Sequence, residues 1–130
     1  MKDISIEQAI KDEQINLKDI KSCPVQFVLA VNDALNVLTG KWKLPIIGAL
    51  LFKSMRFSEM KKTIPKITSR MLSKELKELE LNGVVKRVVD DTTPVTITYQ
   101  LTDSGMSLNG VLDKILEWGL GHRNEFFSQA

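Results

Sequence analysis

The residues best placed to do chemistry lie on one side of a helix that the sequence predicts over residues 68–81. At about 100° per residue, three cations fall within about 60° of one another on one face of this helix, and two serines flank them on one edge. We call this set the cationic front: Ser69, Arg70, Ser73, Lys74 and Lys77. The opposite face carries three leucines: Leu72, Leu76 and Leu79. Such a helix packs its apolar back on a core and presents hydrogen-bond donors to an anionic surface.

The cationic front has the chemistry that a DNA major groove requires, because Arg and Lys bond guanine acceptors or phosphates and Ser bonds either group. The N-terminal residues of a recognition helix usually reach the base edges. We therefore expect Ser69, Arg70 and Ser73 to read bases, and Lys74 and Lys77 to contact phosphate. The competing interpretation is an ordinary solvated helix face.

Charge is unevenly distributed along the chain, although its net charge is only +2. Residues 53–87 hold ten Lys/Arg against four Asp/Glu, and residues 88–130 hold two against six. A basic middle and an acidic tail indicate one face that meets an anionic partner. The margins of the cationic front are acidic: Glu75, Glu78 and Glu80. We expect these glutamates to pair with neighbouring lysines or to keep that rim away from the duplex.

The elements around this helix predict a winged helix-turn-helix. A short helix over residues 58–63, ended by Pro65, precedes the long helix, which Thr68 or Ser69 caps and Asn82-Gly83 ends. Residues 84–90 and 95–101 alternate as two strands joined by a turn over 91–94. Helix, turn and helix form the DNA-binding unit, and the hairpin forms the wing.

Further phosphate contacts are expected from the first helix of the unit and from the wing. The first helix of a helix-turn-helix crosses the DNA backbone, which favours Lys61, Lys62 and Lys66. At the wing we expect contacts from Arg87, Thr92 and Thr93. Because Asp90 and Asp91 would repel phosphate near the tip, we expect the wing to contribute less than a basic wing would.

The remaining segments read as helices over residues 5–20, 24–39, 41–52 and 103–118, so the fold class is mainly α with a small β-hairpin wing. Pro45 falls in the first turn of its helix or just beyond it. The second helix has a stripe expected to be buried: Phe27, Val31, Leu35 and Leu38. We divide the chain into an N-terminal helical extension, residues 1–22, and a winged helix-turn-helix domain, residues 23–130, with helical dimerisation elements at both termini.

Catalytic and metal chemistry have little support. Cys23 is the only cysteine and His122 the only histidine, which excludes an intrachain disulfide and a cysteine metal cluster. No glycine-rich phosphate loop is present. We expect no enzyme, no metal and no cofactor. No apolar run approaches the ~18 residues of a membrane span, and no apolar signal core follows Lys2 and Asp3, so we expect a cytoplasmic protein without a membrane partner.

A set of short motifs, in order, resembles the HxlR-type regulators, bacterial winged-helix proteins distantly similar to MarR-type regulators. The motifs run from Cys23 to Gly119: Cys23-Pro24-Val25, Gly40-Lys41-Trp42-Lys43, Arg56-Phe57-Ser58-Glu59-Met60, Ile67-Thr68-Ser69-Arg70-Met71-Leu72, Leu76-Lys77-Glu78-Leu79-Glu80 with Asn82-Gly83, Tyr99-Gln100-Leu101-Thr102 with Gly105, and Glu117-Trp118-Gly119. The resemblance implies a homodimeric regulator of pseudo-palindromic promoter DNA, with recognition residues at Ser69, Arg70, Ser73 and Lys74. Pro45 and the long N-terminal extension depart from the family pattern.

The last helix carries an apolar stripe that is too wide for one contact surface: Leu108, Val111, Leu112, Ile115, Leu116, Trp118 and Leu120. We expect one side to pack on its own domain and the other on a second copy, with the first helices joining this interface. The alternative is that the stripe only covers the monomer core. A two-fold dimer would place two recognition helices about 34–36 Å apart, one turn of duplex.

Cys23 is a candidate redox sensor, because some regulators of the resembled family sense oxidants or electrophiles through a cysteine in this position. Lys21 and a helix N-terminus would favour the thiolate. A small-molecule or oxidant effector is therefore a candidate partner. The alternative is that a small residue is simply preferred there.

Together these features predict a sequence-specific DNA-binding transcriptional regulator. Repression is favoured over activation, because a small dimer without an added domain acts most simply by blocking polymerase. The alternative is a winged-helix protein-interaction module that does not bind DNA.

Overall fold

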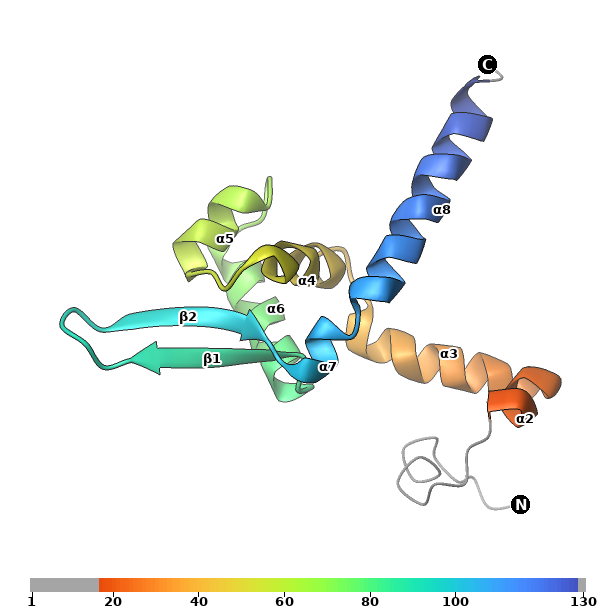
Figure 1. Cartoon of the computed structure of the whole chain (residues 1–130), viewed down its shortest axis with the longest axis horizontal. Helices are drawn as coiled ribbons and strands as arrows, with labels where there is room; N and C mark the ends of the chain where they lie inside the picture. Colours follow the sequence, from red (N-terminus) through yellow and green to blue (C-terminus); the bar gives the residue numbers. More distant parts are fainter. Residues whose placement is uncertain (1–16, 129–130) are drawn as a thin grey trace. The chain divides into compact units, whose positions relative to one another are not determined.

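The computed structural model describes residues 17–128, with side chains to residue 125. The chain divides into two compact units, Met1–Thr39 and Gly40–Ala130. Figure 1 labels the helices and strands of both units. Among the described residues, no helix has the length and apolar character needed to cross a membrane.

The first unit contains two described helices, α2 (Leu17–Ser22) and α3 (Pro24–Leu38), on either side of Cys23. Most of the helix predicted over residues 5–20 lies outside the described residues, and its last part continues to Ser22. Helix α3 begins at the proline, which fits the first turn because its missing N–H would be unpaired there in any case. Its last residue is Leu38 and its C-cap is Thr39, so it ends one residue earlier than predicted.

The prediction of a buried stripe on α3 is wrong for this chain alone. No residue of α3, a helix that lies wholly within the described part of the chain, is buried. Phe27, Val31 and Leu35 are 46%, 41% and 45% exposed, and Leu38 is half-buried. A six-residue helix, the only other described element of this unit, is too small to cover fifteen residues.

The core of the second unit is built by α4 (Lys43–Phe52), α5 (Phe57–Thr63) and α6 (Ser69–Leu81). Their fully buried side chains include Ile46, Ile47, Met60, Leu72 and Leu79. Helix α4 begins two residues later than predicted. Pro45 is its third residue, so its missing N–H removes no helical hydrogen bond, as the sequence indicated.

Local capping explains where α5 and α6 begin. Helix α5 begins at Phe57, one residue before Ser58, and the Glu59 carboxylate accepts a hydrogen bond from the Arg56 backbone N–H at 3.2 Å. Thr68 caps α6, because its hydroxyl accepts from the Met71 N–H at 3.1 Å. The turn between the helices contains Lys66 in the left-handed region, at φ 68°. These findings confirm the predicted helix, turn and second helix.

The wing is a two-stranded antiparallel hairpin of β1 (Val85–Asp90) and β2 (Thr96–Leu101), paired from Val85 with Leu101 to Asp90 with Thr96. Each strand starts one residue later than predicted. Val84 is not in the strand because its N–H bonds the Leu79 carbonyl and closes the end of α6. On the other edge of β2, Met55 forms an isolated bridge with Tyr99.

The prediction of one continuous last helix from residue 103 is wrong. The structure has a short α7 (Asp103–Met106) and a separate α8 (Asn109–Ser128). The Thr102 hydroxyl caps α7 by accepting a hydrogen bond from the Gly105 N–H. The following turn is tighter than an α-helical turn, because the Leu108 N–H bonds the carbonyl of Gly105, three residues earlier. Helix α7 is therefore a single turn, and Thr102 at its start also donates to the Gly83 carbonyl at the base of the wing.

Candidate nucleic-acid interface

The cationic front lies on the exposed side of α6. Its five residues, from Ser69 to Lys77, are all exposed. The leucines on the opposite side, Leu72, Leu76 and Leu79, are at most 1% exposed. This confirms the predicted division of the helix into a packed back and a solvent-facing front, the geometry that a helix inserted into a major groove requires.

The lysines expected to contact phosphate flank the start of α6. Lys61 and Lys62 lie in the last turn of α5, and all three candidate lysines are exposed. Lys66 projects from the turn itself, where its backbone adopts a conformation that costs about 1–2 kcal/mol in an L-residue. The structure therefore brings these cations and the start of the cationic front onto the same helix-turn-helix unit.

The wing residues Arg87, Thr92 and Thr93 are also exposed. At the tip, the Asp90 carboxylate accepts a hydrogen bond from the Thr92 N–H at 3.3 Å. Asp90 therefore shapes the turn that presents the two threonines, besides placing negative charge there. Asp91 is exposed beside it.

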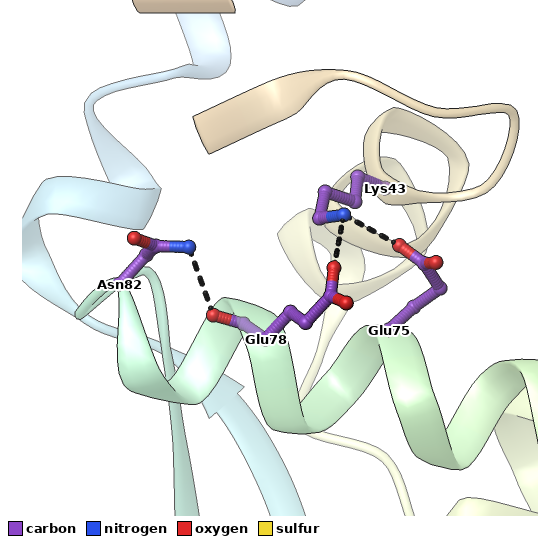
Figure 2. A network of polar contacts seen from close by, with 4 residues as sticks. All are labelled: Lys43, Glu75, Glu78 and Asn82. Carbon is purple, nitrogen blue, oxygen red and sulfur yellow. Dashed lines mark hydrogen bonds and ion pairs between the residues drawn. The ribbon is translucent and has the colours of Figure 1, made fainter. Parts of the chain in front are cut away.

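Two of the three glutamates of α6 pair with a lysine, one of the two roles expected from the sequence, and this lysine lies on another helix. Glu75 is buried and Glu78 half-buried, and both pair with Lys43 of α4 rather than with a lysine of their own helix. Figure 2 shows this network from close by. Glu80 alone of the three is exposed. Lys43 was not predicted as a site residue, although the acidic flank on α6 and a lysine at the start of an apolar helix are both visible in the sequence.

Electrostatics in this network favour the charged forms. Lys43 Nζ lies 2.6 Å from Glu78 Oε2, to which it donates a hydrogen bond, and 2.8 Å from Glu75 Oε2. Burial alone lowers the pKa of Lys43, but the two carboxylates outweigh it and raise the net pKa above its usual value. The hydrogen bond and charge of Lys43, with a smaller effect from Lys74, hold the pKa of Glu78 below its usual value.

Cys23 lies in the first unit, at the N-cap of α3, where it is half-buried. Its carbonyl accepts from the Phe27 N–H, and its own N–H bonds the Ile20 carbonyl. Among the described residues, no three His, Cys, Asp or Glu side chains are grouped in a way that could hold a metal ion.

The residues expected to form a dimer divide between two environments. Leu108 and Leu112 are half-buried. The others are exposed apolar side chains of α8: Val111, Ile115, Leu116 and Trp118, at 46%, 47%, 59% and 70%. Between α4 and α8 lies an apolar groove of about 540 Å³, whose walls include Leu51, Leu112 and Leu116. Helix α8 thus lies against its own domain through Leu112, and it keeps exposed apolar side chains both at this groove, Ile115 and Leu116, and away from it, Val111 and Trp118.

Comparison with known proteins places these features in a family. The family model described as HxlR-like helix-turn-helix matches residues 37–126 of the chain. The HTH-type transcriptional regulator YtcD of Bacillus subtilis (strain 168) is 38% identical over 105 residues, which cover 81% of this chain and 83% of YtcD.

Similar solved structures support the same fold. The redox regulator HypR in its reduced form aligns with a TM-score of 0.71 and 35% identity, over 76% of this chain and 98% of HypR. Reduced YodB from B. subtilis aligns with a TM-score of 0.66 and 34% identity, over 83% of this chain and 97% of YodB. YodB has also been solved with quinone bound. These likenesses confirm the predicted fold class, mainly α with a β-hairpin wing.

Proposed function

The chain belongs to the HxlR-like helix-turn-helix family of transcriptional regulators, and on this premise we propose that it is a repressor that binds pseudo-palindromic promoter DNA as a homodimer. The resemblance seen in its motifs is confirmed by the family match. The family and its relatives are transcriptional regulators rather than enzymes. We place its action in the cytoplasm, where such promoter DNA lies.

The observation that carries this proposal is the orientation of α6. An exposed front with Arg70, Lys74 and two serines can enter the major groove only because the leucines opposite hold the helix on the core. Ser69, Arg70 and Ser73 read base edges, and Lys74 and Lys77 bond phosphates. The lysines of α5 and the turn add backbone contacts, and Arg87, Thr92 and Thr93 of the wing add weaker ones.

The dimer is supported by apolar surface that this chain leaves open. Helix α8 exposes Ile115, Leu116 and Trp118, and α3 buries none of its apolar residues within the described chain. A soluble protein rarely leaves such surfaces in water. A second copy covers them in our proposal and sets two recognition helices about 34–36 Å apart, to match two half-sites. Bound across a promoter, the dimer blocks polymerase.

Cys23 serves as the switch of this regulator in our proposal. Its half-buried thiol lies where α2 meets α3, and the relatives include a redox regulator and a protein solved with quinone bound. An oxidant that takes two electrons and two protons from a pair of Cys23 thiols, one from each subunit, joins them as a disulfide. An electrophile such as a quinone instead forms a carbon–sulfur bond with one thiol. Either change resets the spacing of the recognition helices.

Selection of binding sites from random duplexes tests the proposal. At moderate salt, the protein should enrich a two-fold repeated sequence, and Arg70→Ala with Lys74→Ala should abolish the enrichment. An unenriched pool would contradict DNA recognition, and a double variant with intact function would favour the interaction-module alternative. The switch is tested by repeating the binding measurement with an oxidant, for the wild type and for Cys23→Ser. Wild-type binding that does not change on oxidation would contradict the switch.

A further inference from the structure

Lys43 is a buried cation in a position that its own helix does not favour. It is the first residue of α4, and its side chain is only 8% exposed. The N-terminus of a helix carries partial positive charge, so a lysine there is locally unfavourable. The rest of α4 is apolar, as its sequence KLPIIGALLF shows. The reason for this lysine therefore lies outside α4.

Both partners of Lys43 lie on the recognition helix. Glu75 and Glu78 are three residues apart, which places them on one flank of α6, and Lys43 Nζ lies 2.8 Å and 2.6 Å from them (Figure 2). Glu78 belongs to the last turn of α6, where a negative charge is locally unfavourable. Two charges that each helix alone would disfavour thus compensate each other across the helix–helix contact.

Lys43 is the described charge partner of the buried Glu75 carboxylate. Glu75 Oε2 is fully buried and accepts no hydrogen bond among the described residues, and Lys43 Nζ lies 2.8 Å from it. A Cβ on Gly40 would lie 4.0 Å from the same oxygen, and Gly40 adopts φ 112°, which favours glycine. Asn82 donates a side-chain hydrogen bond to the Glu78 carbonyl at 3.0 Å and closes this end of α6.

The flank held by Lys43 borders the cationic front. At about 100° per residue, Glu78 is about 40° around the helix from Lys74 and Glu75 lies between Glu78 and the leucines. The leucines attach α6 to the core, but hydrophobic contact is non-directional. If α6 turned by about 20°, a side-chain head about 9 Å from the axis would move by about 3 Å, the length of a hydrogen bond. Base reading by Arg70 therefore requires the rotation of α6 to be fixed.

We propose that Lys43 is a positioning residue for DNA recognition: its ion pairs with Glu75 and Glu78 lock the rotation of α6 and so decide which side chains of the cationic front face the base edges. The same pairs neutralise the acidic flank beside Lys74. This inference rests on the proposed function. It also assigns a role to a buried ion pair that stability alone does not explain, since such pairs often give specificity rather than stability.

The test uses variants in which no buried charge is left without a partner of opposite charge. In Lys43→Met/Glu75→Gln/Glu78→Gln the three charges are removed together. Dissociation constants are measured for the sequence selected by the wild type and for an unrelated duplex of equal length, at two salt concentrations. Circular dichroism first establishes that each variant is folded at the temperature used.

We expect the triple variant to lose at least tenfold in the ratio of specific to non-specific affinity. Its non-specific affinity and salt dependence should stay near those of wild type, because the phosphate-contacting lysines are intact. Lys43→Arg, which keeps the charge, should retain most of the ratio. The matched control is Lys53→Met/Glu59→Gln, which removes the exposed pair joined at 3.3 Å and keeps a capping side chain at residue 59; its ratio should not change.

A folded triple variant with the wild-type ratio would overturn the inference. So would a variant whose specific and non-specific affinities fall together, because that is the result of a merely structural role. The wild-type measurement tests the proposed function separately. A wild-type protein that binds both duplexes equally would refute sequence-specific DNA recognition itself.

Discussion

Gly105 lies so close to the backbone carbonyl of Val84 that a methyl group on its Cα would overlap the oxygen. The same methyl would be 3.1 Å from the Leu101 side chain. The Thr102 hydroxyl, which accepts from the Gly105 N–H, also donates to the Gly83 carbonyl at 2.5 Å. These contacts fix the start of α7 against the base of the wing.

Gly105→Ala should therefore destabilise the protein by about 1–3 kcal/mol, the usual cost of overpacking against atoms that cannot move. Urea unfolding monitored by circular dichroism, at fixed protein concentration, measures the change. Gly121→Ala is the matched control, because its added methyl meets no described atom within 4 Å besides the neighbouring residues and backbone of its own helix, and the helix should gain up to about 1 kcal/mol. Equal stabilities for the two variants would contradict the close approach.

Arg70 and Lys77 should fail in different ways when they are replaced. Arg70→Ala should cost about 1–3 kcal/mol of specific binding and relax selection at the bases it reads. Lys77→Ala should weaken binding to all sequences alike and lower the salt slope by about one. Titrations at several salt concentrations, on the selected and an unrelated duplex, separate the two effects. Identical behaviour of the two variants would argue that the cationic front only contacts phosphate.

Lys66 should show opposite effects on stability and on DNA affinity. The left-handed backbone of Lys66 costs about 1–2 kcal/mol, and glycine avoids most of this cost. Glycine also lowers stability by about 0.4–1 kcal/mol, because it increases the conformational entropy of the unfolded chain. Lys66→Gly should thus keep or slightly increase stability, yet reduce the salt slope of DNA binding. Lys62→Gly removes a cation from the regular helix α5 and should instead destabilise by about 1 kcal/mol. A less stable Lys66→Gly would contradict this account.

A charge placed among the exposed apolar side chains of α8 should dissociate the dimer. Leu116 is 59% exposed in the single chain, so Leu116→Asp should leave the monomer fold intact while burying an unpaired carboxylate in the proposed interface. Sedimentation velocity across a range of concentrations should show a monomer. Glu117→Gln, at the neighbouring exposed position, should remain a dimer, and a dimeric Leu116→Asp would show that α8 is not the interface.

Acid should destabilise the fold in part through Glu78. Because the folded state lowers the pKa of Glu78 from 4.5, this carboxylate stabilises the protein above that pH, and the stabilisation is lost as pH falls through the folded pKa. The lowered pKa of Glu59, caused by the Arg56 N–H and Lys53, acts in the same direction. Urea midpoints between about pH 3 and 6 should therefore fall less steeply in Glu78→Gln or Glu59→Gln than in wild type. If the urea midpoints of all three proteins fell equally steeply with pH, the two carboxylates would not be the cause of the acid destabilisation.

Much of the candidate site could be predicted because its signals are local. The positions of Arg70 and Lys74 opposite Leu72 and Leu76 follow from helical periodicity alone, and Asn82-Gly83 marks the end of the helix in the sequence. The hairpin follows from alternation and a turn within about 20 residues. Each feature is decided by side chains a few positions apart, so the sequence determines the cationic front, the winged fold and the family.

Only the tertiary structure decided what depends on distant segments. Lys43 meets Glu78 across 35 residues of sequence, and neither helix alone reveals the partner. The last segment divides into α7 and α8, and Gly105 of α7 packs against Val84, some twenty positions away, a contact that helical periodicity does not show. Periodicity shows that one face of α3 is apolar, but what covers this face depends on a surface elsewhere. Spacing thus determined which residues share a face, and packing decided what each face meets.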